Sequence, residues 1–254
     1  MDLETTIKPF TGKAAIYSKY RPNYPEEYID YLISFNKLTP NSRIADIGAG
    51  TGILTEQLVA RGFKVWAVEP NFDMRTLAEK SLKSHPNFTS LPGTAEETNI
   101  ENASMDLITV GQAFHWFVKD KFKRECQRIL KANSNVALVW NSRDSSSPLV
   151  KENAEICKRF CLAFKGFSKN MDETPHLYKE FFRAGKYEYE IFRHDLQYHQ
   201  EAFVGRNLSS SYAPKPTEEN YSQFVEAIVG LFQKYSKKGM LVVSNLTRSY
   251  IGQV

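Results

Sequence analysis

The segment from Arg43 to Gly52 constrains the fold of this chain more than any other part of it. A short apolar strand runs into the acid Asp46, and three alternating glycines then lead to a helix expected to begin near Ile53. Glycine adopts positive φ without strain and lets a ligand lie against bare backbone. The start of a helix also presents free N–H groups to an anionic or polar ligand. The pattern therefore predicts a nucleotide-type site, with these candidate cofactor-binding residues: Asp46, Gly48, Ala49 and Gly50.

A second short apolar run, residues 64–68, ends at another acid, Glu69, followed by Pro70 and Asn71. The proline ends the strand and holds the residue before it in an extended conformation. A carboxylate at the tip of a second strand can hold the two hydroxyls of a ribose through charge-assisted hydrogen bonds. The alternative is a solvated carboxylate at a strand end.

Two families of nucleotide-binding loop compete for the glycine pattern. The dinucleotide fingerprint G-x-G-x-x-G needs a glycine at its sixth position, where this chain has Ile53. The run Asp-Ile-Gly-Ala-Gly-Thr-Gly, from Asp46 to Gly52, instead resembles the first motif of class I S-adenosylmethionine-dependent methyltransferases. The resemblance implies S-adenosyl-L-methionine as the cofactor. A glycine-rich turn with no ligand is the remaining alternative.

The same resemblance assigns roles to residues further along the chain. It implies that Glu69, with Pro70 and Asn71 beside it, holds the adenosine ribose. It also implies that the backbone of Ala95 and the carboxylate of Glu96 contact adenine after the third strand. The alternative for that last segment is a helix that begins at Thr94, with Glu96 and Glu97 in its first turn.

Strands and helices alternate through the middle of the chain, which predicts a parallel sheet. We expect strands near residues 43–47, 64–68, 88–91, 105–110 and 135–140, and helices near 26–35, 53–61, 72–84 and 118–131. With the resemblance, the expected fold is α/β and Rossmann-like, with a mostly parallel seven-stranded sheet, helices on both faces and a helical lid inserted after strand five. The expected division is a helical cap (1–40), a cofactor-binding core (41–142), and a lid with closing strands (143–254). For the last part we expect helices over 149–167 and 222–235 and strands over 187–198, 240–243 and 249–251.

Aromatic residues surround a histidine directly after the fourth strand, in the run from Gly111 to Phe117. Gln112 can donate or accept hydrogen bonds there, and His115 can act as a general base. In the family that the chain resembles, this loop borders both the cofactor and the substrate pocket. The alternative is that the aromatic rings pack the start of the next helix while His115 bonds only to backbone.

The run from Tyr17 to Pro25 resembles a Tyr-x-x-x-Arg-Pro-x-Tyr-Pro segment that closes over the cofactor in small-molecule methyltransferases. We therefore take Tyr20 and Arg21, together with His115, as the candidate catalytic residues. Arg21 can pair with a carboxylate of the cofactor or of a substrate. The alternative is a surface helix end with packed tyrosines.

Within the superfamily, the chain looks closest to the type 11, trans-aconitate methyltransferase-like branch. This likeness rests on Phe10 to Ala14, on Tyr20-Arg21-Pro22, on Gly111 to Phe117 and, more loosely, on Ser209 to Pro214 and Thr247 to Gly252. It implies methyl transfer to a small molecule, some members of the branch acting on carboxylates. No Asn/Asp-Pro-Pro-aromatic motif follows the fourth strand, so we expect no nucleic acid substrate. Two alternatives stay open: a non-catalytic cofactor-binding protein on the same fold and a nicotinamide-dependent oxidoreductase.

Composition bounds these hypotheses. A net charge of +4 over 254 residues is too small to indicate nucleic acid binding by itself. The N-terminus lacks the pattern of a signal peptide and no apolar run reaches membrane-spanning length, so we expect a cytoplasmic protein without membrane contact, either monomer or homodimer. Cys157 and Cys161 lie one helical turn apart, but no Cys-x-x-Cys or histidine-rich segment accompanies them, and we expect no metal site.

Overall fold

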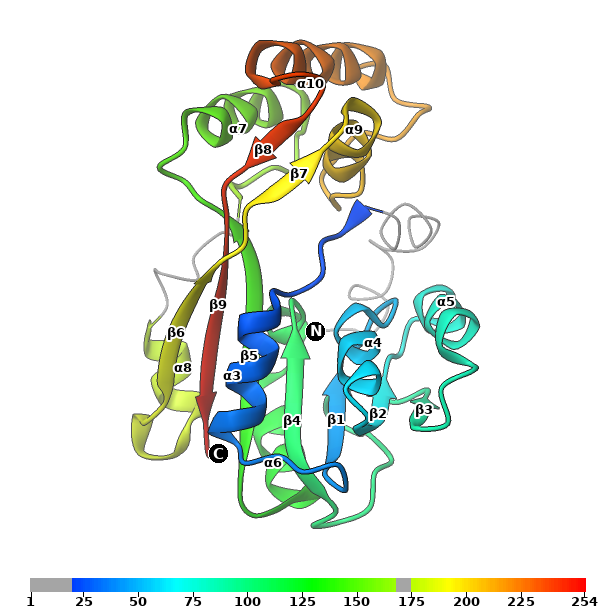
Figure 1. Cartoon of the computed structure of the whole chain (residues 1–254), viewed down its shortest axis with the longest axis vertical. Helices are drawn as coiled ribbons and strands as arrows, with labels where there is room; N and C mark the ends of the chain where they lie inside the picture. The colour runs from blue at the N-terminus through cyan, green and yellow to red at the C-terminus, as the bar shows by residue number, and fades with distance from the viewer. Residues whose placement is uncertain (1–19, 168–174) are drawn as a thin grey trace.

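The computed structural model describes residues 20–167 and 175–254. Its centre is a seven-stranded sheet in the order β3-β2-β1-β4-β5-β9-β6 (Figure 1). The strands from β3 to β5 pair in parallel, and β9 pairs antiparallel with both β5 and β6. The predicted Rossmann-like fold with a mostly parallel seven-stranded sheet is thereby confirmed. The strands of this sheet are β1 (Arg43–Ile47), β2 (Lys64–Val68), β3 (Phe88–Leu91), β4 (Met105–Gly111), β5 (Leu130–Arg143), β6 (Glu188–Arg193) and β9 (Asn245–Gly252).

Helices cover both faces of the sheet, as predicted. On one face, α3 (Glu26–Phe35) and α4 (Ile53–Ala60) pack over a cluster that includes Ile44 and Leu107. On the other face, α6 (Lys119–Ile129) and α8 (Pro175–Phe181) pack over a cluster that includes Ala45 and Ile108. Neighbouring residues of one strand thus enter opposite layers, as the two-residue period of a strand requires. The remaining helices of this part are α5 (Phe72–Leu82), η2 (Phe114–Trp116) and η3 (Arg183–Gly185).

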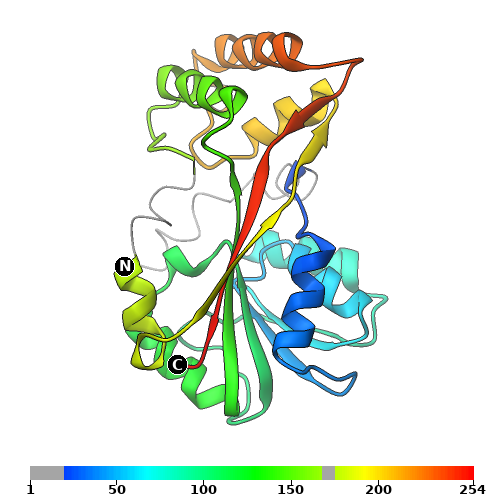
Figure 2. The same cartoon turned by 60° about the vertical axis from the view of Figure 1, so that its left-hand side comes forward.

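A smaller lobe with a hydrophobic cluster of its own stands beyond the carboxyl ends of the parallel strands (Figures 1 and 2). We call it the lid. Only α7 follows β5 directly; the other four elements lie between β6 and β9, so the predicted insertion comes in two pieces. The lid consists of α7 (Pro148–Phe160), β7 (Leu196–Tyr198), α9 (Gln200–Leu208), α10 (Tyr221–Tyr235) and β8 (Leu241–Val243).

The predicted single strand over residues 187–198 is divided between the two lobes. Arg193 pairs with Leu246 in the large sheet, and Leu196 pairs with Val243 in the two-stranded sheet of the lid, without a change of register. Between them, the Asp195 side chain accepts the N–H of Asn245 (3.4 Å). This side-chain acceptor interrupts the ladder, and one antiparallel ribbon therefore connects core and lid.

One further expectation for the lid was wrong, and one helix was not expected. The helix expected over 149–167 ends at Phe160, because Cys161 is extended (φ −118°, ψ 96°) and the chain then turns. Helix α9 was not predicted, since Gly205 lies in its middle and glycine weakens a helical pattern. In the described part of the chain, no helix is long and apolar enough to cross a membrane.

Candidate active site

The glycine loop joins β1 to α4 and needs glycine for two physical reasons. Gly48, Gly50 and Gly52 all have positive φ, of 69°, 59° and 85°. A Cβ atom on Gly48 would also lie 2.6 Å from Cβ of Ala113, while one on Gly52 would lie 3.0 Å from Cδ1 of Leu82 in α5. The third glycine thus serves close packing against a neighbouring helix, the role of the sixth position in the dinucleotide pattern.

Asp46 is buried beneath this loop, where it ties three elements together. Its carboxylate accepts hydrogen bonds from the hydroxyls of Thr55 in α4 (2.6 Å) and Thr109 in β4 (2.9 Å). Burial raises the pKa of Asp46 to about 6, although both hydroxyls favour the charged form. The carboxylate is therefore mainly ionised at pH 7 and fixes the spacing of β1, β4 and α4.

Glu69 lies beside the glycine loop, as expected for an acid at the end of β2. Its side chain is 8% exposed and accepts the backbone N–H groups of Gly50 (2.9 Å) and Asn71 (2.8 Å). The Asn71 side chain in turn accepts the N–H of Met74 (3.0 Å) and so caps α5. Burial raises the pKa of Glu69, while the two N–H groups oppose the shift. A carboxylate has about four acceptor positions, so two are left for a ligand.

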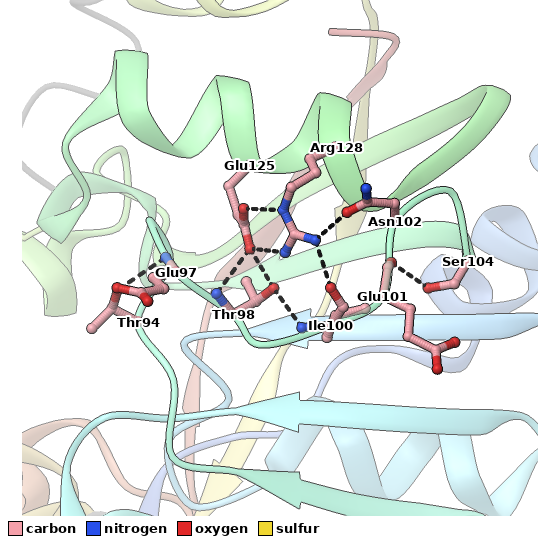
Figure 3. A network of polar contacts seen from close by, with 9 residues as sticks. All are labelled: Thr94, Glu97, Thr98, Ile100, Glu101, Asn102, Ser104, Glu125 and Arg128. Carbon is pink, nitrogen blue, oxygen red and sulfur yellow. Dashed lines mark hydrogen bonds and ion pairs between the residues drawn. The ribbon is translucent and has the colours of Figure 1, made fainter.

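The segment after β3 is held from the other side by α6 (Figure 3). Glu125 accepts the N–H and the hydroxyl of Thr98 (2.8 and 2.5 Å), and Arg128 donates to Glu125 and to the carbonyl of Ile100. Burial alone would raise the pKa of Glu125, but Arg128 and Thr98 stabilise its charge, so that the pKa is lowered. This network fixes the loop that carries the predicted adenine contacts.

The alternative interpretation of that loop, a helix that begins at Thr94, is wrong. Residues 94–97 form no helix; the Thr94 hydroxyl accepts the N–H of Glu97 (3.1 Å) and closes a turn. The carboxylate of Glu96 instead accepts the N–H of Val118 (2.8 Å), at the N-terminus of α6. Ala95 is buried in the core layer beside it.

In the loop after β4, Gln112 has a constrained backbone and Phe114 is buried. Gln112 has a positive φ of 62°, and its side chain donates to the carbonyl of Asn141 (3.0 Å). Non-glycine residues held in this region are concentrated at functional sites. Phe114 is buried against Phe181, so this ring packs the core as the alternative proposed.

His115 lies in η2, outside the layer that Phe114 fills. The ring is 4.8 Å from that of Trp116, and part of it faces solvent. Desolvation and the nearby Lys119 ammonium lower the pKa of His115, so the imidazole is neutral at pH 7. A neutral ring is the form that a general base requires.

The segment before α3 connects core and lid. The Gln57 side chain in α4 accepts the N–H of Tyr24 (2.9 Å) and donates to its carbonyl (2.7 Å). Arg21 donates to the carbonyl of Ser209 (3.3 Å), and the Tyr20 hydroxyl donates to Glu201 of α9 (2.9 Å). Two segments that contribute to the resemblance, Phe10 to Ala14 and Tyr17 to Lys19, lie outside the described residues.

A pocket lies where the strand order reverses, between the ends of β1 and β4, the place where open α/β sheets bind ligands. Its empty space, counted together with its opening to solvent, is about 510 Å³. Its lining is Arg21, Pro22, Tyr24, Asp46, Gly48, Ala49, Gly50, Thr51, Ile53, Leu54, Gly111, Gln112 and Arg206.

Six predicted site residues meet in this pocket: Arg21, Asp46, Gly48, Ala49, Gly50 and Gln112. The other predicted site residues do not line it: Tyr20, Glu69, Pro70, Asn71, Ala95, Glu96 and His115. Glu69 reaches the same loop through its bond to Gly50. Within residues 20–167 and 175–254, no group of three or more His, Cys, Asp or Glu side chains is suited to a metal ion.

Several residues that build the site carry no recognisable sequence signal. Thr55, Thr109 and Gln57 are ordinary helix and strand residues whose partners are known only after folding. Arg206 comes from α9, a helix without a clear amphipathic period, and no motif marked it. A search for basic residues in unassigned segments would have been the single available signal.

Comparison with known proteins identifies the core. Residues 45–138 match the family model described as a methyltransferase domain. An uncharacterized methyltransferase of Mycobacterium tuberculosis is 38% identical over 150 residues, covering 59% of each chain. An uncharacterized methyltransferase of Schizosaccharomyces pombe is 33% identical over 153 residues, covering 60% of each chain. The matched region thus covers about three fifths of the length of each of these relatives.

Solved structures share the fold over nearly the whole chain. A putative type II methyltransferase from Anaeromyxobacter dehalogenans has a TM-score of 0.65 at 19% identity, covering 92% of this chain and 98% of that one. Phosphoethanolamine N-methyltransferase 2 of Haemonchus contortus, solved with S-adenosyl-L-methionine, has a TM-score of 0.52 at 17% identity, covering 96% of this chain and 57% of that one.

Proposed function

We propose that this chain, whose residues 45–138 match a methyltransferase domain, transfers a methyl group from S-adenosyl-L-methionine to a small-molecule acceptor. One observation carries the proposal. The glycine loop, the Glu69 carboxylate bonded to it and a pocket closed by the lid meet at the switch point of the sheet. The strand order reverses there, and open α/β sheets bind their ligands at such a point.

The residues present fit the cofactor. Glu69 keeps two acceptor positions free for a ribose, and a Cβ on Gly50 would meet only the Met74 sulfur, at 3.8 Å, so the loop backbone stays accessible there. The Thr51 hydroxyl is buried without a hydrogen-bond partner among the described residues, which suits a polar ligand at this pocket. When bound, the cofactor supplies a methyl carbon activated by the positive sulfur.

The protein residues hold and orient the ligands. In this proposal Asp46, Gly48, Ala49 and Gly50 form the cradle, with Gln112 at its edge. Glu69, Pro70 and Asn71 hold the ribose end, and Ala95 and Glu96 hold the adenine end. Alignment of an acceptor in a closed pocket can lower a barrier by about 7–11 kcal/mol.

The segment with Tyr20 and Arg21 excludes water, since it bridges from α4 to α9. An acceptor that is already ionised, such as a carboxylate, needs no base. For a hydroxyl or carbon acid, His115 is the candidate base, and its lowered pKa keeps it in the neutral form.

The first test is calorimetric titration with S-adenosylhomocysteine and, in parallel, with NAD. We expect micromolar binding of S-adenosylhomocysteine alone. Glu69→Gln should weaken that binding about 10–100-fold, because one or two charge-assisted hydrogen bonds contribute roughly 1.5–3 kcal/mol. The matched control is Glu97→Gln, an exposed carboxylate in the loop after β3.

Each other outcome has a definite meaning. Binding of NAD alone would return the glycine loop to the dinucleotide class. Full affinity in a folded Glu69→Gln variant would mean that the ribose lies elsewhere. Binding of S-adenosylhomocysteine without methyl transfer to any member of a broad acceptor panel would indicate a non-catalytic protein on this fold.

A further inference from the structure

The lid contributes one charged side chain to the wall of the pocket, and that charge lacks a counterion in the described part of the chain. Arg206 of α9 is 9% exposed and lines the pocket opposite the glycine loop. Its guanidinium has no hydrogen bond or ion pair with any residue between 20 and 167 or between 175 and 254. An unpaired buried charge is strongly unfavourable, so it is kept where a ligand offsets it.

Two further arginines near Arg206 add to the positive charge of this region. Burial, followed by the charges of Arg21 and Arg143, lowers the pKa of Arg206 to about 9, which still leaves it protonated at pH 7. Arg143 is occupied by the ring of Phe167 (3.9 Å) and by the side-chain oxygen of Asn207 (3.3 Å). Glu201, an acid at the start of the same helix, accepts the Tyr20 hydroxyl.

The core side of the pocket forms no ion pair with Arg206 among the described residues. Asp46 lines the same pocket, but its two oxygens are held by the hydroxyls of Thr55 and Thr109, and its charge is not among those that shift the pKa of Arg206. The methionine end of the cofactor carries one ammonium and one carboxylate, and its sulfur is positive. One arginine can match that carboxylate, and we assign this role to Arg21, which also lines the pocket and donates to the carbonyl of Ser209. The charge of Arg206 is then left for a second ligand.

We propose that Arg206 binds an oxyanion group, carboxylate or phosphate, of the methyl acceptor and so selects anionic small molecules. This inference rests on the proposed function, because it needs the cofactor to occupy the other part of the pocket. A planar guanidinium offers paired N–H donors that match carboxylate and phosphate oxygens. The lid, not the methyl-transfer core, would then determine the class of acceptor.

The experiment uses the full chain saturated with S-adenosylhomocysteine and titrates it with small probes. The anionic probes are succinate, citrate and inorganic phosphate, and succinamide is the uncharged counterpart of succinate, all at matched ionic strength. We expect at least one anion to bind, with succinamide at least 10-fold weaker than succinate where succinate is the binder. Arg206→Met should weaken anion binding at least 10-fold, and Arg206→Lys should lie between wild type and Arg206→Met. Affinity for S-adenosylhomocysteine should stay within about 3-fold in all variants.

The matched control is Arg159→Met, which removes the same charge from an exposed position of the lid. A 10-fold loss of S-adenosylhomocysteine affinity in Arg206→Met would overturn the inference, because Arg206 would then hold the cofactor carboxylate. Equal binding of succinamide and succinate, or no anion binding by the loaded wild type, would also overturn it. If Arg206→Met does not fold, Arg206→Lys and the wild-type comparison of charged and uncharged probes still decide the question. Failure of wild type to bind S-adenosylhomocysteine would instead refute the proposed function.

Discussion

The two walls of the pocket differ in how their charges are satisfied. On the core wall, Asp46 accepts two hydrogen bonds from hydroxyl groups, and Glu69, which reaches this wall through its bond to Gly50, accepts two from N–H groups. On the lid wall, Arg206 has no such partner in the described part of the chain. Acids held by neighbouring groups make the core wall rigid, which suits one constant ligand, whereas the unpaired guanidinium of the lid wall requires a ligand of opposite charge. Under the proposed function, this difference would separate a general cofactor site from a specific acceptor site.

The largest expected effect is on the core wall, at Gly48. In Gly48→Ala the new methyl group lies 2.6 Å from Cβ of Ala113, on a residue with φ of 69°. The left-handed conformation costs about 1–2 kcal/mol, and overpacking adds about 1–3 kcal/mol. We expect the loop to shift and the affinity for S-adenosylhomocysteine, measured by calorimetry, to fall at least 100-fold.

A matched glycine separates backbone strain from damage to the loop. Gly62 also has positive φ, of 89°, but a Cβ there meets nothing within 4 Å. Gly62→Ala should therefore lower the unfolding temperature while leaving S-adenosylhomocysteine binding intact. Equal loss of binding in both variants would mean that the core wall is not the cofactor site.

The second prediction concerns the cost of the buried acid. The pKa of Asp46 rises from 3.8 to about 6 on folding, so the folded state holds its proton more tightly than the unfolded state. The free energy of unfolding should therefore fall as pH rises from about 4 to about 6, by up to about 3 kcal/mol, and the loss should be complete above pH 6. Asp46→Asn removes this pH dependence. It also removes a negative charge that raises the pKa of Glu69, so the smaller pH dependence of stability that Glu69 contributes should decrease as well.

Urea unfolding from pH 4 to pH 8 measures the effect as the difference between wild type and Asp46→Asn. The control is Asp120→Asn, an exposed acid in the first turn of α6. If the difference in the free energy of unfolding between wild type and Asp46→Asn stays constant from pH 4 to pH 7, burial does not destabilise the charged Asp46 carboxylate, and the stability cost assigned to this acid is absent.

The core wall was largely predictable from sequence, for a local reason. The bounds of β1, β2 and β3 agree residue for residue with those expected, because each run of strand-forming residues is closed within two positions by a glycine or a proline. The crossover helices then place the strand ends on one rim. Asp46, Glu69, Ala95 and Gly111 are therefore expected to converge on one crevice. Asp46 and Gly111 line one pocket, whereas Glu69 and Ala95 do not.

The lid wall was not predictable, because its geometry depends on contacts between distant residues. The division of β6 from β7 depends on Asp195 and Asn245, which lie 50 residues apart. Arg206 gains its meaning from burial beside a glycine loop more than 150 positions earlier in the chain. Hydrophobic periodicity and helix or strand propensity contain neither kind of information. In addition, Gly205 weakens the helical signal over residues 200–208.

The smallest expected effect tests how the two walls are held together. The ring of Tyr20 lies against α9 at Gly205, where an added Cβ would be 2.5 Å from Cδ2 and Cζ of the ring. Gly205→Ala should displace the ring and weaken the bond from the Tyr20 hydroxyl to Glu201, at a cost of about 1–3 kcal/mol for overpacking. Gly230→Ala is the matched control, since a Cβ at this glycine of α10 meets nothing within 4 Å and should stabilise the helix by about 0.5–1 kcal/mol.

If core and lid close together over the acceptor, Gly205→Ala should weaken anion binding several-fold and leave S-adenosylhomocysteine binding nearly unchanged. Unfolding curves check that Gly205→Ala is less stable than wild type and that Gly230→Ala is more stable. A stable Gly205→Ala protein with unaltered anion affinity would mean that the Tyr20 contact does not position α9. Arg206 would then reach the pocket through the packing of the lid alone, and the two walls would be independent in their energetics as well as in their charge.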